Sequence, residues 1–156
     1  MANSPEPDFH VVLVAPEIPP NTGTTARLCA ATGARLHLVG PLGFSLEDRY
    51  LKRAGLDYWP HVDLEVHPDW QGFRDRHPDA DLKLFSARAT RSYTTASYTP
   101  GDFLVFGGET RGLPAAILAK HPAYTIPMRG TGVRSLNLAN CAAIVLYEGL
   151  RQLGRT

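Results

Sequence analysis

The stretch FHVVLVAPEIPPNTGTTARLCAATGARLHLVG, residues 9–40, decides the fold class. Its opening run is mostly apolar and rich in β-branched side chains, which is typical of a buried strand. A proline-rich loop follows, and Asn21 or Thr22 is the expected N-cap of a helix that ends at Gly33. Residues 35–39 then alternate as a second strand. Two strands joined through a helix in about thirty residues form a β-α-β unit.

The remainder of the chain repeats this alternation of strands and helices. Apolar and β-branched runs predict four further strands, at 62–66, 82–86, 102–106 and 124–128. Amphipathic runs between them predict helical segments at 46–54, 69–76, 114–120 and 135–152. We therefore expect an α/β fold in which helices flank a mostly parallel sheet. Because no repeat, low-complexity tract or interior linker occurs in residues 1–156, we expect a single domain.

The composition is that of an ordinary globular protein. The chain has 156 residues, of which 44% are hydrophobic and 20% are charged, and its formal net charge is +1. No apolar run approaches the roughly 20 residues of a membrane helix. The acidic, proline-containing N-terminus is unlike a signal peptide. We therefore expect a cytoplasmic protein without a membrane partner.

The cysteines and histidines predict no metal site. Cys29 and Cys141 each lie in an apolar helical pattern, which favours packing in the core over nucleophilic catalysis. The six histidines are scattered along the chain, and no group of His and Cys has the spacing of zinc ligands. The sequence therefore indicates a reduced protein that binds no metal.

Three loops that follow predicted strands combine glycine, proline and polar side chains. They are residues 16–23, 107–114 and 128–140. Ligands of open α/β sheets bind outside the carboxyl ends of the strands, so these loops are candidates for one shared site. The segment GTGVRS at 130–135 comes close to a dinucleotide fingerprint. That fingerprint also needs an acidic residue about twenty positions further on, where this chain has Leu150 inside its last predicted helix. A P-loop and a GxSxG nucleophile elbow are absent from the sequence.

The same loops contain three ordered motifs. They are PEIPPNTG at 16–23 with Arg27, FGGETRGLP at 106–114, and IPM at 126–128 with SLNLAN at 135–140. Together they resemble the motifs of the SpoU branch of the SPOUT RNA methyltransferases. The resemblance spans roughly residues 10 to 153 and is greatest to the small members of the family that modify the wobble nucleotide of tRNA.

The resemblance implies a fold detail, a cofactor and an assembly. The C-terminal segment is expected to form a trefoil knot in which S-adenosylmethionine binds bent, largely through backbone groups, and leaves as S-adenosylhomocysteine. Family members are homodimers with sites at the subunit interface, and the smallest have no separate RNA-binding domain. An adenine ring needs an apolar slot, and glycines allow a close approach of the main chain. The positions that match the cofactor site are Ala87, Gly107, Gly108, Gly112, Ile126, Met128, Ser135 and Leu136. For Gly108, a simple turn is the alternative.

The resemblance also implies a reaction, the methylation of the ribose 2′-hydroxyl of C34 or U34 in leucine tRNAs. Arg27 matches the arginine that activates this hydroxyl. Because arginine stays protonated in proteins, the alternative is that it holds the adjacent phosphate while another group takes the proton. Asn21, Glu109 and Asn137 match positions that orient these groups, and Ser135 is expected to contact both cofactor and substrate.

An anticodon stem-loop offers unpaired bases for stacking and phosphates for ion pairs. The candidate contacts are Arg88, Arg91, Tyr93, Tyr98, Arg129, Arg134 and the cluster RYLKR at 49–53, and for each the alternative is a solvated surface residue. No further protein partner is implied. Three other functions stay open: methylation of a different tRNA or ribosomal RNA nucleotide, RNA binding by a catalytically silent knotted protein, and nucleotide binding by a flavodoxin-like fold.

Overall fold

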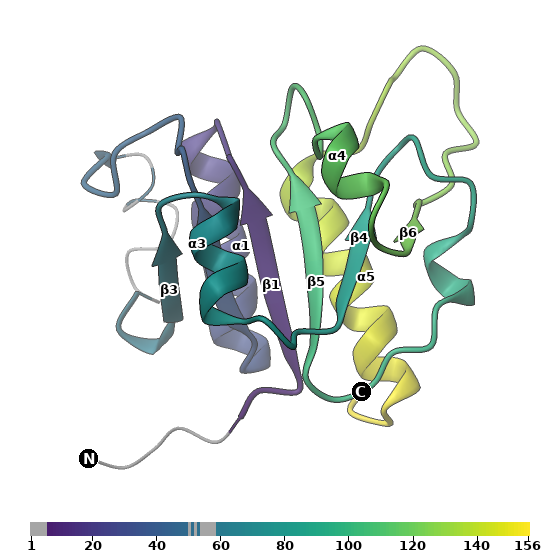
Figure 1. Ribbon diagram of the computed structural model, residues 1–156, viewed down its shortest axis with the longest axis horizontal. Helices are drawn as coiled ribbons and strands as arrows, with labels where there is room; N and C mark the ends of the chain where they lie inside the picture. The colour runs from purple at the N-terminus through teal and green to yellow at the C-terminus, as the bar shows by residue number, and fades with distance from the viewer. Residues whose placement is uncertain (1–5, 50, 52, 54–58) are drawn as a thin grey trace.

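Six parallel strands form the centre of the molecule in the computed structural model, which describes residues 6–49, 51, 53 and 59–156 (Figure 1). Their order across the sheet is β3-β2-β1-β5-β4-β6, and each neighbouring pair is parallel. The α/β fold with a parallel sheet is therefore confirmed. The strands are β1 (Phe9–Val14), β2 (Arg35–Val39), β3 (Asp63–His67), β4 (Leu82–Phe85), β5 (Asp102–Gly107) and β6 (Ala123–Tyr124).

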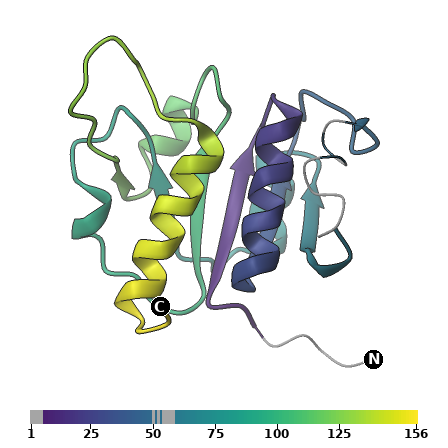
Figure 2. The same ribbon diagram turned by 180° about the vertical axis from the view of Figure 1, so that it is seen from behind.

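Helices cover both faces of this sheet. Helices α1 (Pro19–Thr32) and α5 (Leu138–Gln152) lie together on one face, as Figure 2 shows. Helices α3 (Trp70–Arg76) and α4 (Ala115–Leu118) lie on the other face (Figure 1). Two short 3₁₀ turns, η1 (Trp59–His61) and η2 (Tyr93–Thr95), lie in the connections. Every helix in the described part of the chain is too short or too polar to cross a bilayer.

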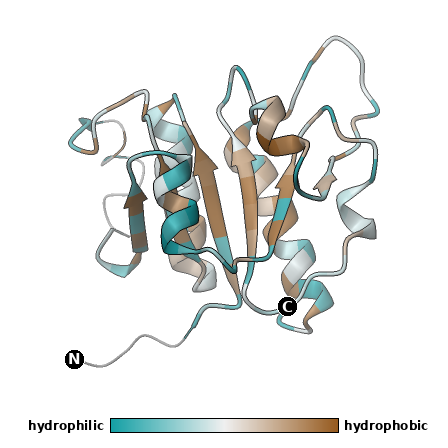
Figure 3. Ribbon diagram, in the orientation of Figure 1, coloured by the Kyte–Doolittle hydropathy of each residue, from teal (hydrophilic) through white to brown (hydrophobic). Residues whose placement is uncertain are grey.

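The central strand β1 is buried on both faces, which explains its unbroken apolar sequence. Side chains of a strand alternate between the two faces of a sheet. Val11 and Leu13 therefore join the core beneath α1 and α5, whereas Val12 and Val14 join the core beneath α3 and α4. Figure 3 shows the resulting hydrophobic centre of the sheet.

The first helix begins earlier than the sequence predicted, and the expected cap is wrong. It starts at Pro19 with Ile18 as N-cap, and no side chain caps it. Proline suits the first helical turn because its missing N–H would have no partner there. Asn21 consequently lies inside the helix, where its side chain is available to the site. The expected end at Gly33 is confirmed, since Gly33 has a left-handed φ of 77°.

The segment between β6 and α5 contains less regular structure than the sequence predicted. The strand expected at 124–128 is only Ala123–Tyr124, because Thr125 pairs with the backbone of Arg91 and Tyr93 and Pro127 cannot donate to a sheet ladder. The helix expected from residue 135 begins at Leu138, since the side chain of Asn137 accepts a hydrogen bond from the backbone of Asn140 and caps it. The helical segment expected at 46–54 lies partly outside the described residues.

Candidate active site

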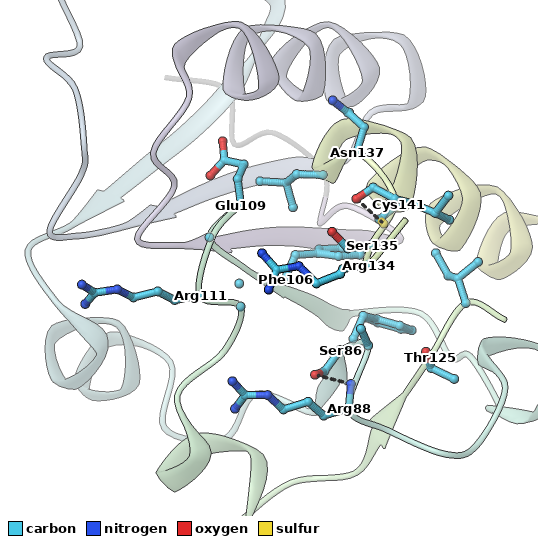
Figure 4. A pocket seen from close by; sticks show the side chains of 18 of the residues that line it. Ser86, Arg88, Phe106, Glu109, Arg111, Thr125, Arg134, Ser135, Asn137 and Cys141 are labelled. Carbon is cyan, nitrogen blue, oxygen red and sulfur yellow. Dashed lines mark hydrogen bonds between the residues drawn. The ribbon is translucent and has the colours of Figure 1, made fainter. Parts of the chain in front are cut away.

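A cavity of about 820 Å³ lies at the carboxyl ends of β4, β5 and β6. Its walls come from the segments that follow these strands, from the 134–138 segment, and from the first turn of α1. Figure 4 shows Glu109 and Asn137 on the side of the cavity nearest α1, with Ser86 and Thr125 on the opposite side. This is the position at which open parallel sheets bind ligands.

The cavity unites nearly all the residues that the sequence singled out. Those that line it are Asn21, Ala87, Gly107, Gly108, Glu109, Gly112, Ile126, Met128, Ser135, Leu136 and Asn137. Arg27 differs, because it is exposed on α1 and is not among the lining residues of this single chain. The three motif loops therefore converge, while Arg27 lies outside the cavity of its own chain.

The carboxylate of Glu109 joins the second motif loop to the first. One of its oxygens accepts the backbone N–H of Glu17, and the other accepts the backbone N–H of Ile18, both at 2.8 Å. The second oxygen also accepts the Nδ2 group of Asn21 at 3.2 Å. In return, a carboxylate oxygen of Glu17 accepts the backbone N–H of Thr110 at 3.1 Å. Hydrogen bonds to charged groups are the stronger ones in proteins, so this exchange holds the two loops firmly together.

The third motif joins the same network through Asn137. Its Nδ2 group donates to Oδ1 of Asn21 at 3.0 Å, and its Oδ1 accepts the backbone N–H of Asn140 at 3.2 Å. The oxygen and the nitrogen of both amide groups, those of Asn21 and Asn137, therefore each have a hydrogen-bond partner. The chain of contacts runs from Glu109 through Asn21 to Asn137, and it unites one residue from each motif.

Two glycines permit the close approach of the second loop to the sheet. A Cβ atom on Gly107 would lie 2.1 Å from the backbone carbon of Gly112, and one on Gly108 would lie 2.6 Å from the carbonyl oxygen of Ala15. Both distances are too short for any other residue without a backbone shift. Gly112 itself has a φ of 66°, in the region that favours glycine. Gly108 is thus required by its contact with Ala15, the residue after β1, and its role goes beyond that of a simple turn.

The chemistry of the walls fits a cofactor that combines an adenine ring with charged groups. Phe106, Ile126 and Leu138 provide apolar surface, and Ser135 provides a hydroxyl. The glycines of the second loop expose backbone groups without a side chain in the way. This combination of apolar walls with a few polar groups is characteristic of cofactor sites.

Neither cysteine has the properties of a nucleophile. Cys29 is buried in the core beneath α1, as expected, and burial raises the pKa of its thiol to about 12. Cys141 packs against the same core, but it also lines the cavity, and burial raises the pKa of its thiol too. A protonated thiol is a poor nucleophile, so both side chains serve packing.

One of the expected RNA contacts is wrong. Tyr98 is only 4% exposed and belongs to the core, where its ring meets that of Phe9 edge-on with the centroids 6.2 Å apart. Its hydroxyl donates to the backbone carbonyl of Tyr93 at 2.7 Å. The polar sequence around it had indicated a surface position, but the segment folds back over α5, where Gln152 accepts the backbone N–H of Tyr98.

The other candidate RNA contacts have varied surroundings. Arg88 and Arg134 line the cavity. Arg129 is exposed and directly follows Met128, which also lines the cavity. The guanidinium of Arg91 lies over the ring of Tyr124, with 4.8 Å to the centroid. The 49–53 cluster lies partly outside the described residues.

Sequence reasoning missed several residues of the cavity. Arg111 lies within the second motif, and Ser86 and Thr125 directly follow two strands. The available signal was the position of Ser86 and Thr125 at the carboxyl ends of strands and of Arg111 within a motif loop. Their chemistry alone, which is common on protein surfaces, gave no reason to choose them.

The sequence pattern of the SpoU rRNA Methylase family matches residues 8–147. The chain belongs to the SpoU methylase family. Its parallel sheet and its three converging loops are thus those of a methyltransferase family, as the resemblance implied.

Relatives of this SpoU methylase cover nearly its whole length. A Burkholderia ambifaria protein named tRNA (cytidine(34)-2′-O)-methyltransferase is 51% identical over 151 residues, which are 94% of this chain and 96% of that protein. The Escherichia coli K12 protein of the same name is 46% identical over 149 residues, which are 94% of each.

Two solved structures agree with the fold. A structure from work on the 2-OH methylation of C/U34 on tRNA superposes with a TM-score of 0.91 at 50% identity, covering 95% of this chain and 97% of that one. AviRb from Streptomyces viridochromogenes, in complex with AdoMet, superposes with a TM-score of 0.84 at 26% identity, covering 96% of this chain and 62% of that one.

Proposed function

We propose that this chain is an S-adenosylmethionine-dependent tRNA methyltransferase that modifies the ribose 2′-hydroxyl of the wobble nucleotide, C34 or U34. The single observation on which the proposal rests is the network from Glu109 through Asn21 to Asn137, which unites the three motifs at one cavity. The names of full-length relatives at about half identity support the same reaction. The leucine isoacceptors, the C-terminal trefoil knot and the cytoplasmic location belong to this proposal through the resemblance alone.

The cofactor is proposed to bind in the cavity between the second and third motif loops. Gly107, Gly112 and Ile126 would hold it through backbone groups, with Met128 and Leu136 as apolar wall. When bound, S-adenosylmethionine supplies a methyl group whose bond to sulfur breaks as a bond to the ribose 2′-oxygen forms, while the hydroxyl proton leaves to an acceptor. The AdoMet complex of the related AviRb supports this choice of cofactor.

The task of the protein is then to position the hydroxyl and to promote loss of its proton. Ser135 and Asn137 are exposed at the cavity and are available to a ribose. Asn21 and Glu109 fix the direction of the Asn137 amide through the hydrogen bonds described above. Holding the ribose 2′-oxygen in line with the methyl donor is itself a large part of catalysis. Two reactants that are already in place do not pay the entropic cost of meeting in solution.

A second copy of the chain is proposed to complete the site. Arg27 lies outside the cavity of its own chain, although the family pattern assigns it to the substrate. Large apolar side chains are exposed around the cavity, and such a patch is typical of an interaction surface. They are Ile18 at 45%, Met128 at 39%, Val133 at 65% and Leu136 at 37% exposed. In a homodimer, Arg27 of one chain would reach the cavity of the other and hold the phosphate beside the reacting ribose.

The alternative of a ribosomal RNA substrate has weaker support. The AdoMet-bound rRNA methyltransferase from Sinorhizobium meliloti is 25% identical, and this chain covers 57% of it. The relatives named for tRNA are about twice as similar and are covered almost completely. We further propose that residues 1–156 act as one domain and that the surfaces of both subunits hold the anticodon stem-loop.

Transfer of a labelled methyl group tests this function. The protein is incubated with labelled S-adenosylmethionine and an unmodified tRNA transcript, and the product is digested and mapped by mass spectrometry. We expect the label on the ribose of nucleotide 34. The matched control is the same tRNA with a 2′-deoxyribose at position 34, which should accept nothing. A label on a base, or on the deoxy control, would contradict the proposal.

A further inference from the structure

A cluster of histidines lies between the sheet and α3, apart from the cavity described above. Rings come from His10 of β1, His37 of β2, His67 of β3 and His77 directly after α3, and Glu65 of β3 adds a carboxylate. The first three rings are at most 4% exposed. None of the five side chains lines the cavity of the proposed methyl transfer. The histidines that looked scattered in the sequence therefore meet in space.

Four of these side chains bring one possible ligand atom each into a small group. Nδ1 of His37, Nε2 of His67, Nε2 of His77 and a carboxylate oxygen of Glu65 all lie within 4.8 Å of one another. Three of the atoms form a nearly equilateral triangle, with edges of 3.1 Å (His37 to His67), 3.3 Å (His37 to Glu65) and 3.4 Å (His67 to Glu65). The fourth, Nε2 of His77, lies 2.8 Å from the same oxygen of Glu65.

Three of the four ligand atoms lie at the spacing of a tetrahedral metal site. Zn²⁺ binds imidazole nitrogen and carboxylate oxygen at about 2.0–2.2 Å, which sets neighbouring ligand atoms of a tetrahedron about 3.3 Å apart. The triangle of His37, Glu65 and His67 therefore has the size of one tetrahedral face. Three histidines with one carboxylate are also ligand types that Zn²⁺ accepts.

The protonation states suit a cation. Burial lowers the pKa of His10 to about 4 and also lowers the pKa values of His37 and His67, because a charged imidazolium is poorly solvated there. Near pH 7 these rings are thus neutral and keep a lone pair. Burial is the largest single influence on the pKa of Glu65 and acts to raise it, but the hydrogen bond from His77 and the charges of neighbouring groups such as Arg76 together lower the pKa, so the carboxylate is charged.

Further contacts hold the rings in position. Nε2 of His37 lies 2.8 Å from Nδ1 of His10, so that His37 can donate to His10 while its own Nδ1 faces the common centre. Histidine ligands of metals are characteristically oriented by such a hydrogen bond from the second ring nitrogen. The ring of His10 in turn stacks on Phe103 with the centroids 3.8 Å apart, and Phe73 meets the rings of His37 and His67 edge-on.

We propose that His37, Glu65, His67 and His77 form a structural site for Zn²⁺. Four protein ligands complete a tetrahedral shell and leave no position for a substrate, which distinguishes structural from catalytic zinc. The ion would tie β2 and β3 to the end of α3. A surface cavity of about 400 Å³ that His10 and His77 help to line gives the ion a route from solvent.

Binding of the metal alone tests this site. The full chain, without a histidine tag, is stripped with a chelator, dialysed and titrated with Co²⁺, whose visible absorption is far stronger in a tetrahedral site than in water. We expect one Co²⁺ per chain, its displacement by Zn²⁺, and a melting temperature that rises with Zn²⁺ concentration.

Two variants and a matched control locate the ligands. His77 is partly exposed at the end of a helix, so His77→Gln should fold, and we expect it to weaken Co²⁺ binding about tenfold or more. Glu65→Gln should have a similar effect. His121→Gln changes a partly buried histidine outside the cluster and should bind Co²⁺ as the parent does. A folded parent without the tetrahedral spectrum, or equal binding by His77→Gln and His121→Gln, would overturn the proposal.

Discussion

Nδ2 of Asn137 donates a hydrogen bond to Oδ1 of Asn21 at 3.0 Å, although the two residues lie 116 positions apart. Asn137 is at the same time the N-cap of α5, through the bond from the backbone of Asn140. One side chain therefore begins the last helix and connects the third motif to the first. This double role allows stability and activity to be separated by mutation.

Asn137→Ser is expected to keep the helix cap and to lose the contact with Asn21. Serine caps helices about as well as asparagine, but its short side chain cannot reach a second partner. We expect a free energy of unfolding close to that of the parent, near-normal donor binding, and a methyl-transfer rate lower on the order of 100-fold. Chemical denaturation, calorimetry with the donor and single-turnover transfer measure these three quantities.

Asn137→Ala supplies the comparison, since it removes the cap and the contact together. Its unfolding free energy should fall by about 1 kcal/mol relative to the serine variant, with a similar transfer rate. Equal transfer by Asn137→Ser and the parent would show that the contact with Asn21 has no role in positioning.

Gly107→Ala is expected to destabilise the protein by roughly 1–3 kcal/mol. The added Cβ would lie 2.1 Å from the backbone of Gly112, so the second loop must move. Because Gly107 and Gly112 are also proposed to hold the cofactor through their backbone groups, donor affinity should fall as well. Gly130→Ala is the control: its Cβ would meet nothing within 4 Å, and its φ lies outside the left-handed region. Urea denaturation measures the free energy of unfolding of both variants. Equal values would refute the argument that a side chain at position 107 collides with Gly112.

Mixed dimers test whether Arg27 acts across the subunit interface. Arg27→Ala leaves the cavity intact, whereas Ile126→Trp fills the cavity and leaves Arg27 intact. Each variant alone should be inactive. If Arg27 acts on the other subunit, a refolded equal mixture should recover about a quarter of parental activity, because half of the dimers are mixed and each contains one complete site.

The same experiment has a clear contrary outcome. If Arg27 served the cavity of its own chain, no site in the mixture would be complete and activity would stay absent. Donor binding by the Arg27→Ala chains, measured by calorimetry, shows that the unfilled cavity is folded, so that absent activity reflects the position of Arg27.

The sequence predicted the central strands well because they are buried along nearly their whole length. β1 and β2 are enclosed on both faces, so their apolar runs are continuous and end where the sheet ends. The convergence of the motif loops followed from the same pattern, since parallel strands bring their carboxyl ends to one edge. Eleven of the predicted site residues line the cavity for this reason.

What the sequence could not predict depends on contacts between distant segments. The beginning of α1 was misplaced because Asn21 resembles a cap, whereas its amide is used by Glu109 and Asn137. Tyr98 lies in a polar stretch and is buried only because that stretch packs on the end of α5. The histidine cluster is assembled across three strands and a helix end, so no spacing along the chain could reveal it. The trefoil knot and the dimer stay predictions.

The union of helix cap and site residue in Asn137 has a consequence for biosynthesis. A nascent polypeptide whose α5 is still inside the ribosome has the first and second motifs but not the amide that connects them to the third. The proposed site therefore stays incomplete until α5 has left the ribosome and formed, because the three motifs are joined only when Asn137 reaches Asn21.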